Sequence, residues 1–65
     1  MKEITLNLAG ESMTFRYDPA FTQLETRLSD NEWYPVSFVT LACGRILSPG
    51  DVLLCIRLKV SPAHN

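Results

Sequence analysis

Residues 4–17 alternate between apolar and polar side chains, a period of two that an extended backbone turns into one apolar face. The alternation is interrupted once, at residues 9–12, which are small or polar and include Gly10. A short glycine-bearing break between two alternating segments is typical of a β-hairpin. We therefore predict two paired strands that share an apolar face formed by Ile4, Leu6, Leu8, Met13, Phe15 and Tyr17.

The period changes after Tyr17, and residues 18–30 have the spacing of a helix. Asp18 can accept a bond from a free backbone N–H, and Pro19 has the φ angle of a first helical residue, so the pair indicates a helix start. Asn31 tolerates the left-handed conformation that is common just past a helix and is expected to end it. The apolar stripe of this predicted helix consists of Phe21, Leu24 and Leu28.

The segment 36–47 permits two interpretations, because a short apolar run can be a buried strand or a buried helix. Its β-branched and aromatic residues, such as Val36, Phe38 and Thr40, favour a strand. Val39, Cys43, Ile46 and Leu47 also lie at helical spacing. We predict a strand here and keep the helix as the alternative.

The segment 52–60 alternates apolar residues with Arg57 and Lys59, which predicts a strand with both cations in solvent. Pro49 and Gly50 between the two segments suit a type II turn, and would make a second hairpin. The rival interpretation is a helix that begins at Pro49, capped by Ser48 and with Asp51 in its first turn. We adopt the strand because of the alternating cations.

Together these elements predict an α+β fold of order ββαββ, in which two β-hairpins form a small, mostly antiparallel sheet with one helix on one face. Sixty-five residues are too few for a second hydrophobic core, so residues 1–60 are expected to form a single domain and residues 61–65 a flexible carboxyl-terminal tail. A core this small is often stabilised by association with another chain.

The predicted order resembles the ubiquitin-like β-grasp fold, and residues 39–47 followed by Gly50-Asp51-Val52 look like the later strands of small sulfur-carrier proteins. The chain ends Pro62-Ala63-His64-Asn65 and lacks the Gly-Gly terminus of those carriers, so no carrier function is implied.

The first half is also similar to the opening of short phage tail-assembly proteins, through residues 6–10 and 15–18 and Leu24-Glu25. That family is mainly helical after its opening hairpin. The second likeness therefore implies helices at 36–47 and 49–60, where the β-grasp likeness implies strands.

Charge and hydropathy restrict the partner classes. Six basic and seven acidic residues are scattered along the chain and give a net charge of −1, which argues against nucleic acid because binders usually show a basic stripe. Arg45, Arg57 and Lys59 are the cations that a pairing of the last two strands would bring together. The opening residues do not form an apolar secretory leader, and no run is long enough to cross a bilayer. We expect a cytoplasmic protein, in the host cytoplasm if viral, with no membrane partner.

The residues that commonly carry chemistry are sparse and isolated. We expect Cys43 and Cys55 to be reduced and to act as small apolar side chains, since a disulfide would need one particular strand register. One histidine, His64, lies in the predicted tail, and two cysteines with one histidine do not make a zinc site. The sequence therefore predicts no enzyme, no metal, no cofactor and no small-molecule substrate.

Trp33 and Tyr34 lie together in an otherwise polar connection. Such aromatic residues often anchor interfaces, although Trp33 could instead cover one end of a small core. We expect a non-enzymatic protein-interaction module, an adaptor or inhibitor, with a phage or prophage origin as a hypothesis. The alternative is a phage structural or assembly protein, or a subunit of an obligate oligomer. The candidate partner-binding residues are Trp33, Tyr34, Arg45, Arg57 and Lys59.

Overall fold

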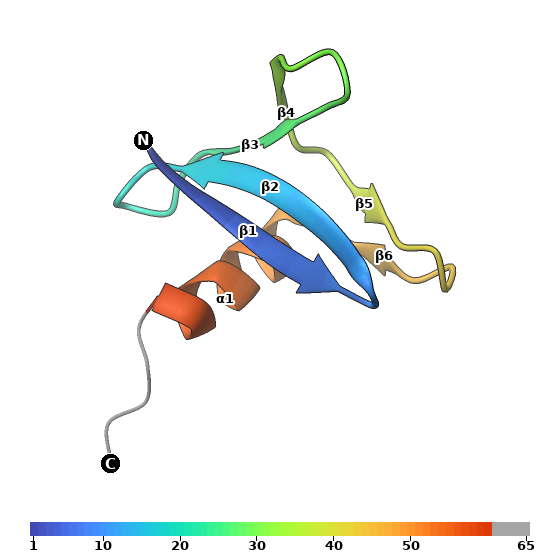
Figure 1. Ribbon diagram of the computed structural model, residues 1–65. Coiled ribbons are helices and arrows are strands. Elements are labelled where there is room, and N and C mark those ends of the chain that lie inside the picture. The colour runs from blue at the N-terminus through green and yellow to red at the C-terminus, as the bar shows by residue number, and fades with distance from the viewer. Residues whose placement is uncertain (61–65) are drawn as a thin grey trace.

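The computed structural model describes residues 1–60, in which six strands are followed by one helix (Figure 1). The fold class is α+β, as predicted, but the helix follows all of the strands instead of lying between two hairpins. The predicted tail 61–65 and His64 lie outside the described residues. The elements are β1 (Lys2–Leu8), β2 (Glu11–Tyr17), β3 (Leu24–Arg27), β4 (Trp33–Pro35), β5 (Val39–Thr40), β6 (Ile46–Leu47) and α1 (Pro49–Val60).

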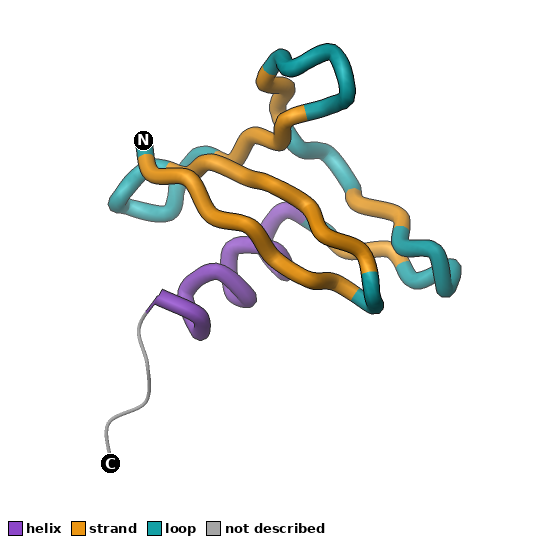
Figure 2. Tube along the Cα trace, in the orientation of Figure 1, coloured by secondary structure: helices purple, strands orange, loops and turns teal. Residues whose placement is uncertain are grey.

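The first four strands form one antiparallel sheet in the order β1-β2-β3-β4, and β5 and β6 form a separate two-stranded ribbon. Figure 2 shows α1 lying across one face of the larger sheet, below β1 and β2. The predicted first hairpin is confirmed, with Leu8 opposite Glu11 at its closed end. Ala9 and Gly10 both have positive φ angles, 52° and 86°, as a two-residue type I′ turn requires.

The predicted helix over residues 18–30 is wrong, because Asp18 caps a turn instead of a helix. Its carboxylate accepts the backbone N–H groups of Thr22 and Gln23, each at 2.6 Å, and Phe21 has a φ of 58°, which no right-handed helix contains. The chain then returns as β3, which pairs with β2. Of the predicted stripe Phe21, Leu24 and Leu28, Leu24 is buried and Leu28 is exposed.

Asn31 does adopt the left-handed conformation, with a φ of 69°, but it does so in the turn that joins β3 to β4. That turn is closed by backbone bonds from the Leu28 N–H to the Glu32 carbonyl (3.1 Å) and from the Asn31 N–H to the Leu28 carbonyl (2.9 Å). The conformational preference of asparagine was therefore predicted correctly and attached to the wrong element.

The predicted strand over residues 52–60 is also wrong, since this segment is the helix α1. The rival interpretation holds: the Asp51 N–H donates to Ser48 Oγ (3.2 Å) and the Ser48 N–H donates to Asp51 Oδ2 (3.0 Å), which is a capping box. Pro49 occupies the first helical position, where its missing N–H costs nothing. These start signals outweigh an alternation that depended on two cations.

The segment 36–47 is extended in part, as predicted, but it pairs with itself. Val39 lies opposite Leu47 and Thr40 opposite Ile46, so the predicted pairing with residues 52–60 is wrong. The turn between these strands contains Gly44 with a φ of 91° and is closed by the Leu41 N–H, which donates to the Arg45 carbonyl at 2.8 Å. The helix that the phage-like opening implied at 49–60 is present as α1, whereas residues 36–47 are not helical and the order ββαββ is not found.

The core lies between α1 and the facing side of the sheet. Val52 and Ile56, one helical turn apart, are fully buried and meet Phe15, which is also fully buried. The ribbon covers one end of the core through Leu41 and Leu47. The eight buried side chains among the described residues are Leu6, Phe15, Tyr17, Leu24, Leu41, Leu47, Val52 and Ile56.

Candidate protein-contact surface

The five residues predicted to bind a partner do not form one surface. Trp33 and Tyr34 are on β4, Arg45 is in the turn of the ribbon, and Arg57 and Lys59 are in α1. Arg57 lies over the ring of Phe21, with its guanidinium carbon 4.7 Å from the ring centroid. Because α1 is a helix, the side chains of Arg57 and Lys59 lie on opposite flanks of it. Lys59 and Arg45 line two adjoining hollows, which are described below.

Trp33 is half-buried on the outer face of the sheet, the face turned away from α1. The guanidinium carbons of Arg16 and Arg27 lie 4.7 Å and 5.4 Å from its ring centroid, and Arg16 forms an ion pair with Glu25. Trp33 therefore does not cover the core; it packs against neighbouring strands. The Trp33 cluster, defined as Arg16, Glu25, Arg27 and Trp33, holds β4 against the sheet.

Tyr34, the neighbour of Trp33 on β4, has an exposed ring, and its hydroxyl donates to Asp30 Oδ2. This bond, with one from the Glu32 N–H (3.0 Å), lowers the pKa of Asp30, and the same bond raises the pKa of the Tyr34 hydroxyl. Both groups are exposed, so the pair secures the β3–β4 turn and does not create a reactive centre.

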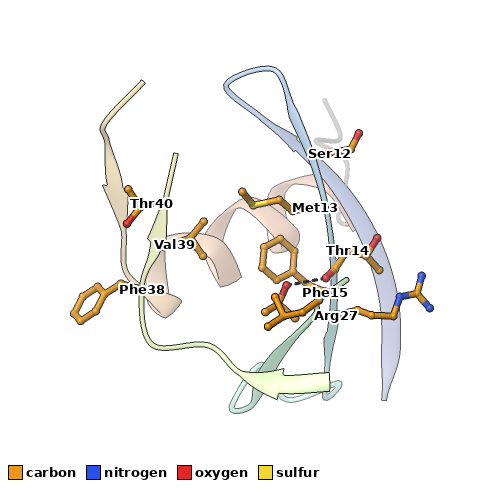
Figure 3. A pocket seen from close by; sticks show the side chains of 10 residues that line it. Ser12, Met13, Thr14, Phe15, Arg27, Phe38, Val39 and Thr40 are labelled. Carbon is orange, nitrogen blue, oxygen red and sulfur yellow. Dashed lines mark hydrogen bonds between the residues drawn. The ribbon is translucent and has the colours of Figure 1, made fainter. Parts of the chain in front are cut away.

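A pocket of about 400 Å³ opens between β2, β3 and the ribbon. Figure 3 shows Val39 directed into this pocket toward Met13 and Phe15, while Phe38 points away from it. The Thr26 hydroxyl donates to the Thr14 carbonyl across its wall at 3.1 Å. The lining of the pocket is mixed: its apolar members are Met13, Phe15, Leu28, Phe38 and Val39, and its polar members are Ser12, Thr14, Thr26, Thr40 and the charged Arg27.

The outward face of α1 is apolar, a feature that the predicted strand over residues 52–60 did not include. Leu54 and Leu58 are four residues apart and therefore share one face of the helix, and they are 57% and 70% exposed. A strand would have placed both beside Ile56 in the core. The helix places them opposite Ile56, where no other part of residues 1–60 buries them.

β1 is an edge strand over its whole length. In a two-residue hairpin the closing pair is hydrogen-bonded, so the backbone N–H and carbonyl groups of Leu8, Leu6 and Ile4 bond to β2. The backbone groups of the residues between them point away from β2. The backbone groups of Glu3, Thr5 and Asn7 therefore point to the free edge. One contact there bears this out, since Lys59 Nζ donates to the Thr5 carbonyl at 3.1 Å.

A groove lies along this edge, between β1 and α1. One hollow of about 470 Å³ is lined by Leu6, Asn7, Leu8, Cys55, Leu58 and Lys59. A second hollow of about 420 Å³ is lined by Asn7, Leu8, Ala9, Leu41, Cys43, Arg45, Leu47 and Cys55. The two share three residues, and together they are called the β1–α1 groove. Its charged side chains are Lys59 and Arg45, and no carboxylate is among these lining residues.

Two further aspartates, Asp51 and Asp18, have structural partners. The Ser48 N–H and hydroxyl lower the pKa of Asp51, and the Arg45 guanidinium lowers it further. The Thr22 hydroxyl, with backbone N–H groups, lowers the pKa of Asp18. Cys43 and Cys55 are free thiols. Within residues 1–60, no three His, Cys, Asp or Glu side chains are placed to share a metal ion, and no helix is long and apolar enough to span a bilayer.

Comparison with known proteins adds no relative. No protein-family model, curated protein or solved structure matches this chain.

Proposed function

We propose that this chain is a non-enzymatic protein-interaction module, an adaptor or inhibitor, whose contact surface is the β1–α1 side of the molecule. We define the contact surface as Leu54 and Leu58 of α1, the free edge of β1, and the β1–α1 groove between them. The observation that carries the proposal is the exposure of Leu54 and Leu58 on the outward face of α1.

An amphipathic surface helix normally places polar residues opposite its buried stripe. α1 buries Val52 and Ile56 and still carries leucines on the opposite side. Exposed apolar groups of this kind, next to a groove and an unpaired strand edge, are typical of a surface that a partner covers. The Trp33 cluster is a weaker candidate, because its ring and its charges already contact one another.

Site-specific photo-cross-linking tests the proposal in cells that naturally express the chain. A benzophenone amino acid replaces Leu58 in one variant, Leu54 in a second and Glu3, at the β1 edge, in a third. We expect each to form the same discrete heterologous adduct. A matched probe at Ser37, which is exposed and outside the surface, should form none. Adducts from Ser37 equal to those from Leu58, or none from any position, would contradict the proposal.

A second candidate function is a subunit of an obligate oligomer, such as an assembly protein, because the same leucines could be buried by another copy. Size-exclusion chromatography with light scattering across a hundredfold dilution separates the two candidates. A monomer that stays folded at all concentrations supports the interaction module; a dimer or larger species that Leu58→Glu dissociates supports the oligomer. A phage origin remains a hypothesis on which neither candidate depends.

A further inference from the structure

We propose that the free edge of β1 takes up an extended segment of another protein as an added strand, with apolar side chains in the β1–α1 groove and a carboxylate beside Lys59. This inference rests on the proposed function and names the chemistry of the partner. It is an instance of strand addition, in which backbone bonds supply affinity and alternate side-chain pockets supply selectivity.

The backbone of β1 is arranged for such pairing. Glu3, Thr5 and Asn7 present their N–H and carbonyl groups at the edge, and β1 is seven residues long, enough for several consecutive bonds. Among the described residues, the side chain that hydrogen-bonds to the backbone of this edge is that of Lys59, which donates to the Thr5 carbonyl. An incoming strand would replace a single exposed contact by a ladder of backbone bonds.

The groove fits one face of such a strand. Side chains of an added strand project alternately above and below the sheet, so every second residue would point toward α1. There it would meet Leu6 and Leu8 on the sheet and Cys55 and Leu58 on the helix. Leu58, which is 70% exposed, would become buried by this contact. The occupant therefore carries apolar residues at alternate positions.

The charged side chains of the groove indicate which charge the incoming segment carries. Lys59 lines it, and no carboxylate of residues 1–60 lies within ion-pair distance of Lys59. Arg45 lines the adjoining hollow, partly balanced by Asp51. A segment with a carboxylate on the face that meets Lys59 would form an ion pair with this exposed cation.

A second copy of this chain fits the groove poorly. Antiparallel pairing of β1 with its copy about Thr5 would bring both Lys59 ammonium groups to the same place on the dyad, and like charges there repel. A nucleic acid lacks the regular backbone donors and acceptors that a strand edge pairs with. The occupant that the edge and the groove favour together is an acidic, alternately apolar peptide segment.

A model peptide tests the inference directly. The probe is acetyl-Glu-Thr-Val-Thr-Val-Thr-Glu-amide, which carries valines and carboxylates on one face; the control is the same peptide with lysine in place of glutamate. Binding is followed by amide NMR shifts and hydrogen exchange on the uniformly labelled chain. We expect the acidic probe to bind and to protect the amides of Glu3, Thr5 and Asn7, and the lysine peptide to bind at least about tenfold more weakly.

Variants of the chain test whether the charge of Lys59 is responsible for binding the acidic probe. Lys59→Glu is expected to weaken binding of the acidic probe about tenfold and to improve binding of the lysine peptide. Lys59→Gln removes the charge with little change of size, and should weaken the acidic probe several-fold. Arg57→Glu is the matched control, since Arg57 lies on the other flank of α1 against Phe21, outside the groove, and should change binding less than about twofold. Melting temperatures confirm that each variant is folded.

Any of the following peptide results overturns the inference: equal binding of both peptides, no binding at the solubility limit of the acidic probe, or binding without protection of the three edge amides. A dimer that the probe does not displace would assign the edge to a second copy and would also overturn it. Cross-linking from Leu58 and Leu54 tests the proposed function independently of the peptide experiment. Heterologous adducts without strand addition would leave the interaction module standing and remove only this inference.

Discussion

Trp33 illustrates how one side chain can look like an interface anchor and serve the fold. Its sequence position, next to Tyr34 in a polar stretch, is typical of both roles. The structure gives its ring two guanidinium neighbours, Arg16 and Arg27, from two other strands. Neighbours of this kind come from strand register, which joins residues far apart in the chain. No local pattern around Trp33 could have predicted them.

Replacing Trp33 should therefore affect stability, by an amount smaller than a core substitution. We expect Trp33→Ala to lower the free energy of unfolding by about 1–2 kcal/mol, since it removes two cation–π contacts and a half-buried ring. Phe15→Ala, which empties a fully buried site, should cost about 3–5 kcal/mol. Phe38→Ala, at an exposed aromatic, is the surface control and should change less than about 0.5 kcal/mol. Urea titrations followed by circular dichroism measure all three; a loss for Trp33→Ala as large as for Phe15→Ala would place Trp33 in the core.

Among the elements, those fixed by adjacent residues were predictable and those fixed by distant partners were not. The first hairpin follows from strict alternation around a Gly10 turn, and it was predicted correctly. β3 has an alternation of its own, with Leu24 and Thr26 on the inner face of the sheet and Glu25 on the outer face. The sequence also places Phe21, Leu24 and Leu28 at helical spacing, and this second pattern favoured a helix. Only pairing with β2, which brings Arg16 beside Glu25, distinguishes the two patterns.

The helix α1 shows the opposite error, because its local signals were sufficient and were outweighed. Ser48, Pro49 and Asp51 specify a helix start, whereas the alternation of Arg57 and Lys59 only permits a strand. In the helix those two cations lie on opposite flanks, at Phe21 and at the Thr5 carbonyl. Capping residues bond directly to backbone groups and therefore indicate where a helix begins. A short alternation of charged residues indicates only that those side chains contact solvent.

Truncation along α1 separates helix from strand without a structure determination. We expect Ile56→Ala to cost about 2–4 kcal/mol, since Ile56 is fully buried, and Leu54→Ala or Leu58→Ala to cost less than about 0.5 kcal/mol in the isolated chain. In a strand all three would share one face, and their costs would be similar. Equal losses at the three positions in chemical denaturation would contradict the helix.

At the scale of the whole molecule, three aspartates hold the connections between elements. Asp18 caps the β2–β3 turn, Asp30 the β3–β4 turn and Asp51 the start of α1. Each accepts hydrogen bonds that favour its charged form and lower its pKa below the ordinary value. The connections around the small core are therefore held by hydrogen bonds that favour the ionised form of these carboxylates.

Acid should consequently loosen the molecule. A carboxyl group with a lowered pKa in the folded state contributes stability above its unfolded pKa, and that contribution is lost as the pH falls through the folded value. We expect the urea midpoint to be level from pH 7 to about pH 5 and to fall below about pH 4, with the loss spread over three carboxyl groups. The raised pKa of Tyr34 has the opposite sign, so its bond to Asp30 is lost only above about pH 10.

The triple variant Asp18→Asn, Asp30→Asn, Asp51→Asn is the matched test of that dependence. Asparagine can still accept one hydrogen bond at each turn but has no charge to lose, so this variant should be less stable at pH 7 and should lose clearly less stability than the unaltered chain between pH 5 and 3. Glu3→Gln, at the exposed edge of β1, is the control and should retain the slope of the unaltered chain. A triple variant that keeps the full acid sensitivity would show that the loss comes from net positive charge across the whole surface instead of from the three turns.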